Sequence, residues 1–369
     1  MRTQTPRFFH VQPFKALMLS VSIMAALTGT AAAAQTDGLP VLPAITSAMA
    51  AQSVMLSVTR AGQRLVAVGE RGFIIVSDDN GTTWKQVSSP VSMTLVKVRF
   101  IDERQGWAVG HAGVVLHSQD GGLSWSKQLD GVQAAEIELQ EASRGTDEQA
   151  QERLAQARQL VDDGPDKPLL DVLFLDARNG WVVGAYGLAF VTHDGGLSWQ
   201  SIRSRLDNPN GLHLYSIELV GTDLFVAGEQ GTLLRSSDEG QTFEALASPY
   251  EGTTFGLQVT GSGSVVAFGL RGKAFESRDR GATWQPLDTL QPVTLTSGLR
   301  LDDGSVLLAD ESGRVLRFAG GDTKAAVLQI PKTSYFTGMA QAANGDLIIS
   351  SARGMLSSAL AAESPEHDQ

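Results

Sequence analysis

The stretch of sequence that decides the fold is LLDVLFLDARNGWVVGAYGLAFVTHDGGLSWQSI, residues 169–202. It divides into four pieces of four to eight residues, rich in alternating or β-branched apolar residues and bounded by Gly, Asp or Asn. Such pieces are typical of short β-strands joined by tight turns. The stretch therefore predicts a unit of four consecutive antiparallel strands.

The end of this unit, THDGGLSW, recurs along the chain. The motif Ser/Thr-x-Asp-x-Gly-x-Thr/Ser-aromatic occurs five times, at Ser77–Trp84, Ser118–Trp125, Thr192–Trp199, Ser236–Phe243 and Ser277–Trp284. The closing aromatic residues are 41, 74, 44 and 41 residues apart, so an insertion precedes the third copy. A four-stranded unit repeated at this spacing is typical of the blades of a β-propeller.

The number of units predicts the number of blades. Five units carry the motif, at 54–87, 95–129, 169–202, 214–246 and 255–287. Two degenerate units follow at 295–328 and 335–360, and the second has only three strands. We therefore predict an all-β, seven-bladed propeller with four-stranded blades. Because a closed ring removes exposed sheet edges, we expect Leu42–Met49 to supply the missing outer strand of blade seven.

The repeated Asp residues have two interpretations, one as catalytic or calcium-binding groups and one as structural groups of the turns. At five regularly spaced turns, a structural role is the simpler explanation, because an Asp side chain can accept backbone N–H bonds within a turn. We assign this role to Asp79, Asp120, Asp194, Asp238 and Asp279. We expect Trp107 and Trp181, from the second strands of their units, to pack in the core.

The first 34 residues are predicted to be a signal peptide. Basic residues precede the apolar run 16–27, which is shorter than the roughly 20 residues of a spanning helix. Residues 31–34 offer a cleavage site, after Ala34 or Ala33. We therefore expect residues 35–369 to form the propeller, exported to the periplasm or secreted, with no membrane span after signal cleavage.

Composition excludes several function classes. The chain has 29 basic and 40 acidic side chains, a net charge of −11, and the part after residue 34 carries −14. So acidic a chain is poorly suited to bind nucleic acid, which requires neutralisation of phosphates. The absence of Cys excludes disulfides, Cys-ligated metals, a Cys nucleophile and a Cys-linked lipid anchor.

The repeated motif is the Asp-box, also called the bacterial neuraminidase repeat. The wider unit in 169–199 and 95–125 resembles the photosystem II stability/assembly factor family of plants and cyanobacteria, which has relatives in non-photosynthetic bacteria. The resemblance extends over about 54–287 and is weaker in the last two blades. It implies a seven-bladed propeller and a non-enzymatic assembly factor that binds a membrane-protein client. Only the scaffold motif matches, so the resemblance assigns no functional residue.

Two functions stay open. The first is an exported scaffold, not an enzyme, that binds a protein client of the envelope or of a membrane complex. The alternative is a secreted sialidase/glycosidase-like or carbohydrate-binding Asp-box propeller. No Arg-Ile-Pro motif of sialidases is present, but the carboxylate pair of other glycosidases stays open among 40 acids. The six His residues show no metal-ligand spacing, so we expect no metal and no cofactor.

Propeller topology predicts where a partner would bind. The turns between second and third strands lie on one face, here called the top face, and the Asp-boxes lie on the opposite box face. The top-face turns hold our candidate partner-binding residues, which are Glu70, Arg71, His111, Tyr186, Glu229, Gln230, Arg271, Glu311 and Arg353. Second candidates are first-strand residues facing the channel, namely Lys97, Arg99, Asp171, Glu218 and Gln258.

The insertion at 130–168, between blades two and three, is predicted to be helical. Thr146 and Gln149 have the spacing of a capping box. The apolar positions that follow, Ala150, Leu154, Ala157 and Val161, have helical spacing. A shorter helix is expected over 132–142. We expect the helices to stand at the channel mouth, either as a solvated decoration or as a lid or docking element.

Overall fold

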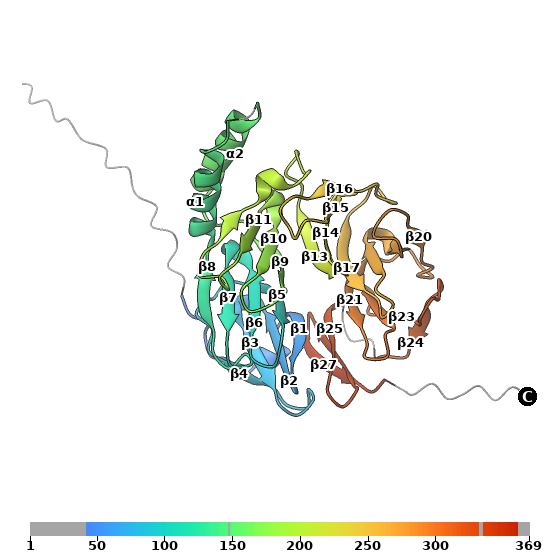
Figure 1. The fold of residues 1–369 in the computed structure, drawn as a ribbon. Helices are drawn as coiled ribbons and strands as arrows, with labels where there is room; N and C mark the ends of the chain where they lie inside the picture. Colours follow the sequence, from blue (N-terminus) through green and yellow to red (C-terminus); the bar gives the residue numbers. More distant parts are fainter. Residues whose placement is uncertain (1–41, 147, 332–334, 361–369) are drawn as a thin grey trace, which may run out of the picture. The chain divides into compact units, whose positions relative to one another are not determined.

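The structure is a computed structural model that describes residues 42–146, 148–331 and 335–360. In this part of the chain, 27 strands form seven antiparallel sheets, six with four strands and one with three (Figure 1). The predicted seven-bladed β-propeller is thus confirmed. The predicted signal peptide, residues 1–34, lies outside the described residues.

The helical insertion lies in the chain between blades two and three. Blade one consists of β1 (Met55–Ala61), β2 (Arg64–Gly69), β3 (Ile74–Ser77) and β4 (Lys85–Val87). Blade two consists of β5 (Leu95–Phe100), β6 (Gly106–Gly110), β7 (Val115–Ser118) and β8 (Ser126–Leu129). Blade three consists of β9 (Leu169–Phe174), β10 (Gly180–Gly184), β11 (Ala189–Thr192) and β12 (Gln200–Ser201).

The remaining blades follow without a long insertion. Blade four consists of β13 (Leu214–Val220), β14 (Asp223–Gly228), β15 (Leu233–Ser236) and β16 (Glu244–Ala245). Blade five consists of β17 (Thr254–Val259), β18 (Val265–Gly269), β19 (Ala274–Ser277) and β20 (Gln285–Pro286). Blade six consists of β21 (Leu295–Arg300), β22 (Val306–Asp310), β23 (Val315–Phe318) and β24 (Ala326–Leu328). Blade seven consists of β25 (Phe336–Gln341), β26 (Leu347–Ser351) and β27 (Gly354–Ser358).

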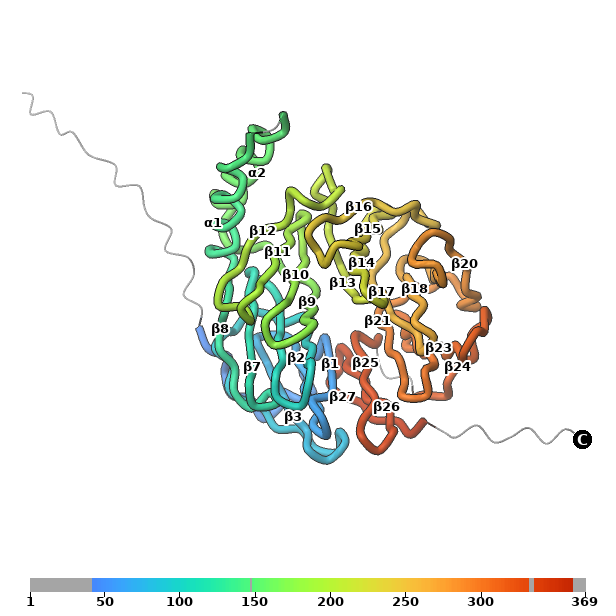
Figure 2. The backbone as a smooth tube through the Cα atoms, in the orientation of Figure 1, coloured from blue at the N-terminus to red at the C-terminus, as the bar shows by residue number. Residues whose placement is uncertain are grey.

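The ring closes where blade one meets blade seven. The first strands pack side by side around the axis, and β1 contacts β25 at the seam (Figure 2). The Thr337 hydroxyl donates to the Met55 carbonyl oxygen at 2.6 Å. A buried cluster joins Met55 and Leu65 of blade one to Ala340 and Ile348 of blade seven. Side-chain packing therefore holds the seam, without a strand shared between the two blades.

The prediction that Leu42–Met49 forms the outer strand of blade seven is wrong. This segment has no strand, and it bonds to blade one, where the Ser47 N–H donates to Gln86 Oε1 at 2.8 Å. Only five residues separate Met49 from β1, and three of them form the 3₁₀ turn η1 (Ala50–Gln52). The link from β4 to β5, which runs from the outer strand of one blade to the innermost strand of the next, has seven residues. The five-residue link before β1 is too short for the same path, so Leu42–Met49 does not reach the outer edge of blade seven.

Hydrogen bonds organise each Asp-box turn in the same way. In blade three, Asp194 Oδ1 accepts the Ser198 N–H at 2.9 Å, and Oδ2 accepts the Ser198 hydroxyl at 2.5 Å. The Thr192 hydroxyl donates to Asp194 Oδ1 and accepts the Gly196 N–H at 2.9 Å. These bonds, led by the one from the Ser198 hydroxyl, lower the pKa of Asp194 to about 2.

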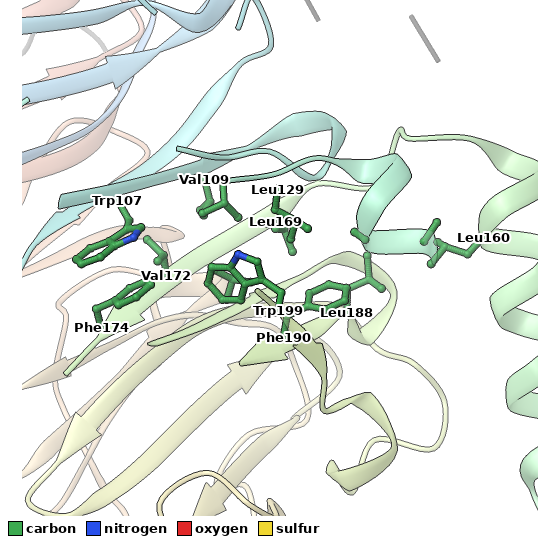
Figure 3. Close-up of a cluster of buried hydrophobic side chains, with 14 residues drawn as sticks. Trp107, Val109, Leu129, Leu160, Leu169, Val172, Phe174, Leu188, Phe190 and Trp199 are labelled. Atoms are coloured by element: carbon green, nitrogen blue, oxygen red, sulfur yellow. The ribbon is translucent and has the colours of Figure 1, made fainter. Parts of the chain in front are cut away.

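The aromatic residue that closes each box packs against the preceding blade. Trp199 of blade three meets the edge of Phe174, with ring centroids 6.1 Å apart, in a cluster that also holds Val109 of blade two (Figure 3). Trp107 stacks on Phe174 at 3.6 Å and is 1% exposed, and Trp181 is 2% exposed. The tryptophans of the second strands therefore belong to the core, as the sequence predicts.

Both predicted helices are present in the insertion, as α1 (Gly131–Ala142) and α2 (Ala150–Asp163). The capping box lies at α1, where the Asp130 side chain accepts the Gln133 N–H and the Gln133 side chain accepts the Asp130 N–H. The N-cap residue of α2 is Gln149, so the predicted box beginning at Thr146 is wrong. Helix α2 begins four residues after Thr146, beyond the reach of that side chain.

The helical pair lies at the outer edge of the blades and not at the channel mouth (Figure 1). Helix α1 contacts β12, the outermost strand of blade three, and its Ala134 and Ala135 join the buried cluster between blades two and three. Glu138, 4% exposed, accepts the Ser201 hydroxyl at 2.5 Å. The expected position was wrong because α1 starts directly after β8, which is itself outermost, and its small apolar face matches the neighbouring outer strand.

Candidate protein-binding site

Four of the top-face turns are short 3₁₀ turns, namely η2 (Glu70–Gly72), η3 (His111–Gly113), η4 (Ala185–Gly187) and η6 (Leu270–Gly272). Each is tied to its own blade by a backbone bond; the His111 N–H, for example, donates to the Thr94 carbonyl at 2.9 Å. The second turn residue has positive φ in five blades, including φ 57° at both Tyr186 and Arg271. This conformation disfavours large side chains.

The nine candidate turn residues are distributed around the ring. Seven are exposed: Arg71, His111, Tyr186, Gln230, Arg271, Glu311 and Arg353. Glu70 and Glu229 are half-buried, and their carboxylates accept the N–H groups of Val54 at 3.2 Å and His213 at 2.9 Å. No hydrogen bond or ion pair in the described part of the chain joins any two of the nine, because each blade contributes a turn at a separate place on the ring.

The channel is a cavity of about 590 Å³ lined by the first strands of the blades. Each first strand starts at the top face, so its second residue lies near the top mouth. These second residues all line the cavity; they are Leu56, Val96, Leu170, Tyr215, Phe255, Thr296 and Thr337. The mouth is therefore apolar over blades one to five and polar over blades six and seven.

Three of the second candidates form a hydrogen-bonded cluster at this channel, and Lys97 lines the channel beside them. Arg99 of β5 bonds Asp171 of β9 through Nε at 3.1 Å and Nη2 at 2.7 Å. Its Nη1 bonds Glu218 of β13 at 2.8 Å. One guanidinium thus connects blades two, three and four. Gln258 lines the same cavity, but its side-chain amide donates to the carbonyl oxygen of Val259 at 3.3 Å.

Burial and charge act against each other in this cluster. Burial would raise the pKa of Asp171, but the positive charges of Arg99 and Lys97 outweigh it and hold that pKa below its usual range. Burial raises the pKa of Glu218, since its bond to Arg99 offsets the loss of water only in part. Burial also lowers the pKa of Lys97, and within the described chain this ammonium has no hydrogen-bond partner. Lys97 is therefore a cation of the channel without a hydrogen-bond partner among the described residues.

An aromatic row leads from the top face to the channel mouth, and only its first member, Tyr186, is among the site residues predicted from the sequence. Tyr186 of η4 contacts His213 with ring centroids 4.9 Å apart, and Lys167 lies over the Tyr186 ring at 5.2 Å. His213 contacts Tyr215 at 6.3 Å, and Tyr215 contacts Phe255 at 5.2 Å. The sequence does contain a signal for two of the missed residues. Tyr215 and Phe255 are aromatic residues at the second position of the first strand in two consecutive blades.

Two features are absent from the described part of the chain, a metal site and a membrane-spanning helix. No group of three or more His, Asp or Glu there is arranged to hold a metal ion. No described helix has the length and apolarity to cross a membrane. The top face offers aromatic surface and exposed Arg side chains, and the channel below it holds the Lys97 ammonium. This combination is suited to binding a polypeptide segment.

Two curated relatives are similar over part of the chain. Photosystem II assembly lipoprotein Ycf48 of Synechococcus sp. (strain CC9902) is 29% identical over 118 residues, 31% of this chain and 35% of the relative. The chloroplastic photosystem II stability/assembly factor HCF136 of Oryza sativa subsp. japonica is 27% identical over 134 residues, 35% of this chain and 32% of the relative. Both matches cover less than two thirds of the relative.

Solved structures share the fold. A structure of YCF48 bound to D1 peptide has a TM-score of 0.60 and 17% identity, covering 88% of this chain and 96% of that chain. A streptogramin B lyase has a TM-score of 0.63 and 12% identity, covering 83% of this chain and 93% of that chain. At these identities, the likeness shows the propeller alone.

The decisive comparison is with a family model described as photosynthesis system II assembly factor YCF48. It matches residues 76–152 and 150–356, which include all five Asp-boxes, the first degenerate unit and most of the second. The chain therefore belongs to the YCF48 family of photosystem II assembly factors.

Proposed function

We propose that this protein is an exported, non-enzymatic scaffold that binds an extended segment of a protein client, from the envelope or a membrane complex, on its top face. The observation that carries the proposal is the aromatic row from exposed Tyr186 to Phe255 at the channel mouth. Tyr side chains bury large areas at little entropic cost and are enriched among residues that dominate binding energy.

The cations of the channel and of the top face support a polypeptide client. Lys97 lies unpaired in the channel, and Arg71, Arg271 and Arg353 are exposed on the top face of an otherwise acidic protein. Arg pairs well with carboxylates, and such rim charges act mainly on the rate and specificity of encounter. A solved relative is bound to a D1 peptide, which supports a peptide ligand for the fold.

Site-specific cross-linking tests the proposal. A benzophenone amino acid in place of Tyr186, with the protein expressed in its native envelope, should give adducts with envelope proteins. The matched control carries the same group in place of Leu197, which is 86% exposed on the box face of the same blade. Equal adducts from both positions, or adducts only from position 197, would refute the top-face site.

A glycan array distinguishes the alternative function. The scaffold proposal expects no binding and no cleavage across the array. Glycan binding that Tyr215→Ala abolishes would instead assign the channel to a carbohydrate.

A further inference from the structure

Blade six lacks the aromatic residue that closes the Asp-box in blades one to five. In blade four, Phe243 directly precedes Glu244, and Glu244 pairs with Arg235. In blade six, the equivalent pair is Arg317 with Ala326, which places Ala325 at the aromatic position. The turn itself reads Gly320-Gly321-Asp322 and carries no box.

In blades one to five, the closing aromatic residue fills a gap beside the preceding blade. Trp125 packs with Val66 and Val76 of blade one. The glycine of the same box also packs closely on blade one, since a Cβ on Gly122 would lie 2.9 Å from Val66 Cγ2. In blade six, a Cβ on Gly320 or Gly321 would meet no atom within 4 Å. The turn glycines of blade six therefore do not pack on blade five, whereas the box glycine of blade two packs on blade one.

The result is a cavity of about 430 Å³ between blades five and six. The residues that line it come from both blades and include Val266, Glu276, Leu287, Val306 and Phe318. By strand register, Val266 and Glu276 correspond to Val66 and Val76, the two residues under Trp125 in blade one. Phe318 stands where the boxes have Ser or Thr, and it fills only part of the gap.

The opening of this cavity lies on the box face. Its rim consists of the loops between first and second strands, 260–262 and 304, and of the turn 319–322. It is therefore separate from the top-face site.

We propose that this cavity binds one aromatic side chain of a partner protein, with tryptophan preferred, in place of the missing box aromatic. Val266 provides the wall that Val66 provides under Trp125, and Glu276, in place of Val76, adds a carboxylate to the cavity. Glu276, 8% exposed, accepts the Ser264 hydroxyl at 2.5 Å and two N–H groups of Arg278 at 3.0 and 2.8 Å. A carboxylate has about four acceptor sites, so one is left for an indole N–H. This inference goes beyond the proposed function and does not depend on it.

The test uses N-acetyl-tryptophanamide as the probe, titrated into the whole protein and followed by NMR of labelled methyl groups. We expect saturable shifts of the Val266, Leu287 and Val306 methyls, with weaker binding of N-acetyl-phenylalaninamide. Ala325→Trp should refill the cavity from within, weaken probe binding at least tenfold and raise the melting temperature. Ala325→Phe provides a second, smaller filling should the indole not fit.

The matched control is Thr323→Trp, which adds the same ring on the exposed side of the same turn. It should leave probe binding unchanged. The proposal is overturned if the probe shifts other methyls, or if folded Ala325→Trp and Ala325→Phe bind the probe as well as the parent protein does.

Discussion

One carboxylate organises each Asp-box turn, and Asp194 is representative. Asp194→Ala leaves the N–H and hydroxyl of Ser198 without their acceptor. Since the turn is half exposed and water replaces part of the loss, we expect the free energy of unfolding to fall by about 1–2 kcal/mol. Denaturant titration measures it. Leu197→Ala, in the same turn, should change stability little, and equal losses in the two variants would contradict this role.

The channel cluster predicts a larger effect. Arg99→Met leaves the carboxylate of Asp171, 1% exposed, without its ion-pair partner. Removing one partner of a buried ion pair costs about 3–5 kcal/mol. The control is Arg300→Met, an exposed residue that lines the same cavity and has no ion pair within the described chain. Comparable unfolding midpoints for the two variants would show that Arg99 does not hold blades two to four together.

At the scale of elements, Glu138 determines how α1 docks on β12. Burial raises the pKa of Glu138 above its ordinary 4.5, although the Ser201 hydroxyl and the Arg203 charge oppose the shift. A raised carboxyl pKa means that the stabilising contribution is present at low pH and is lost as pH rises through the raised value. The charged form therefore weakens docking at neutral pH.

We predict that Glu138→Gln raises the melting temperature at pH 7 and that this gain disappears near pH 4. Thermal unfolding at both pH values measures it. Glu136→Gln, on the exposed side of α1, should change neither value. A gain that persists at pH 4 would show that ionisation of Glu138 is not the cause.

At the scale of the whole molecule, close packing of blade seven on blade one keeps the ring closed. A Cβ on Gly338 would lie 2.7 Å from Ser350 Oγ and 3.1 Å from Ser57 Cα across the seam. Gly338→Ala should therefore lower the free energy of unfolding by about 1–3 kcal/mol through overpacking. Gly320→Ala, where the added Cβ meets open space, is the control, and denaturant titration of both variants decides. Equal free energies of unfolding for the two variants would mean that the seam accommodates the added methyl group without cost.

Local chemistry in the sequence was enough to predict the blades and the two helices. The Asp-box bonds join residues two to four positions apart, and strand alternation and helical spacing are equally local, so each repeat unit carries its own folding information. The positions of turn residues such as Tyr186 on the top face followed from the same topology.

The tertiary structure alone decided which distant residues meet. Arg99 is 72 residues from Asp171 and 119 from Glu218, and their contact depends on how seven blades curve around one axis. The same curvature brings Tyr215 beside Phe255 and leaves a cavity between blades five and six. Leu42–Met49 likewise follows blade one because the five-residue link to β1 limits how far this segment reaches. Such contacts depend on packing between units, which no single repeat encodes.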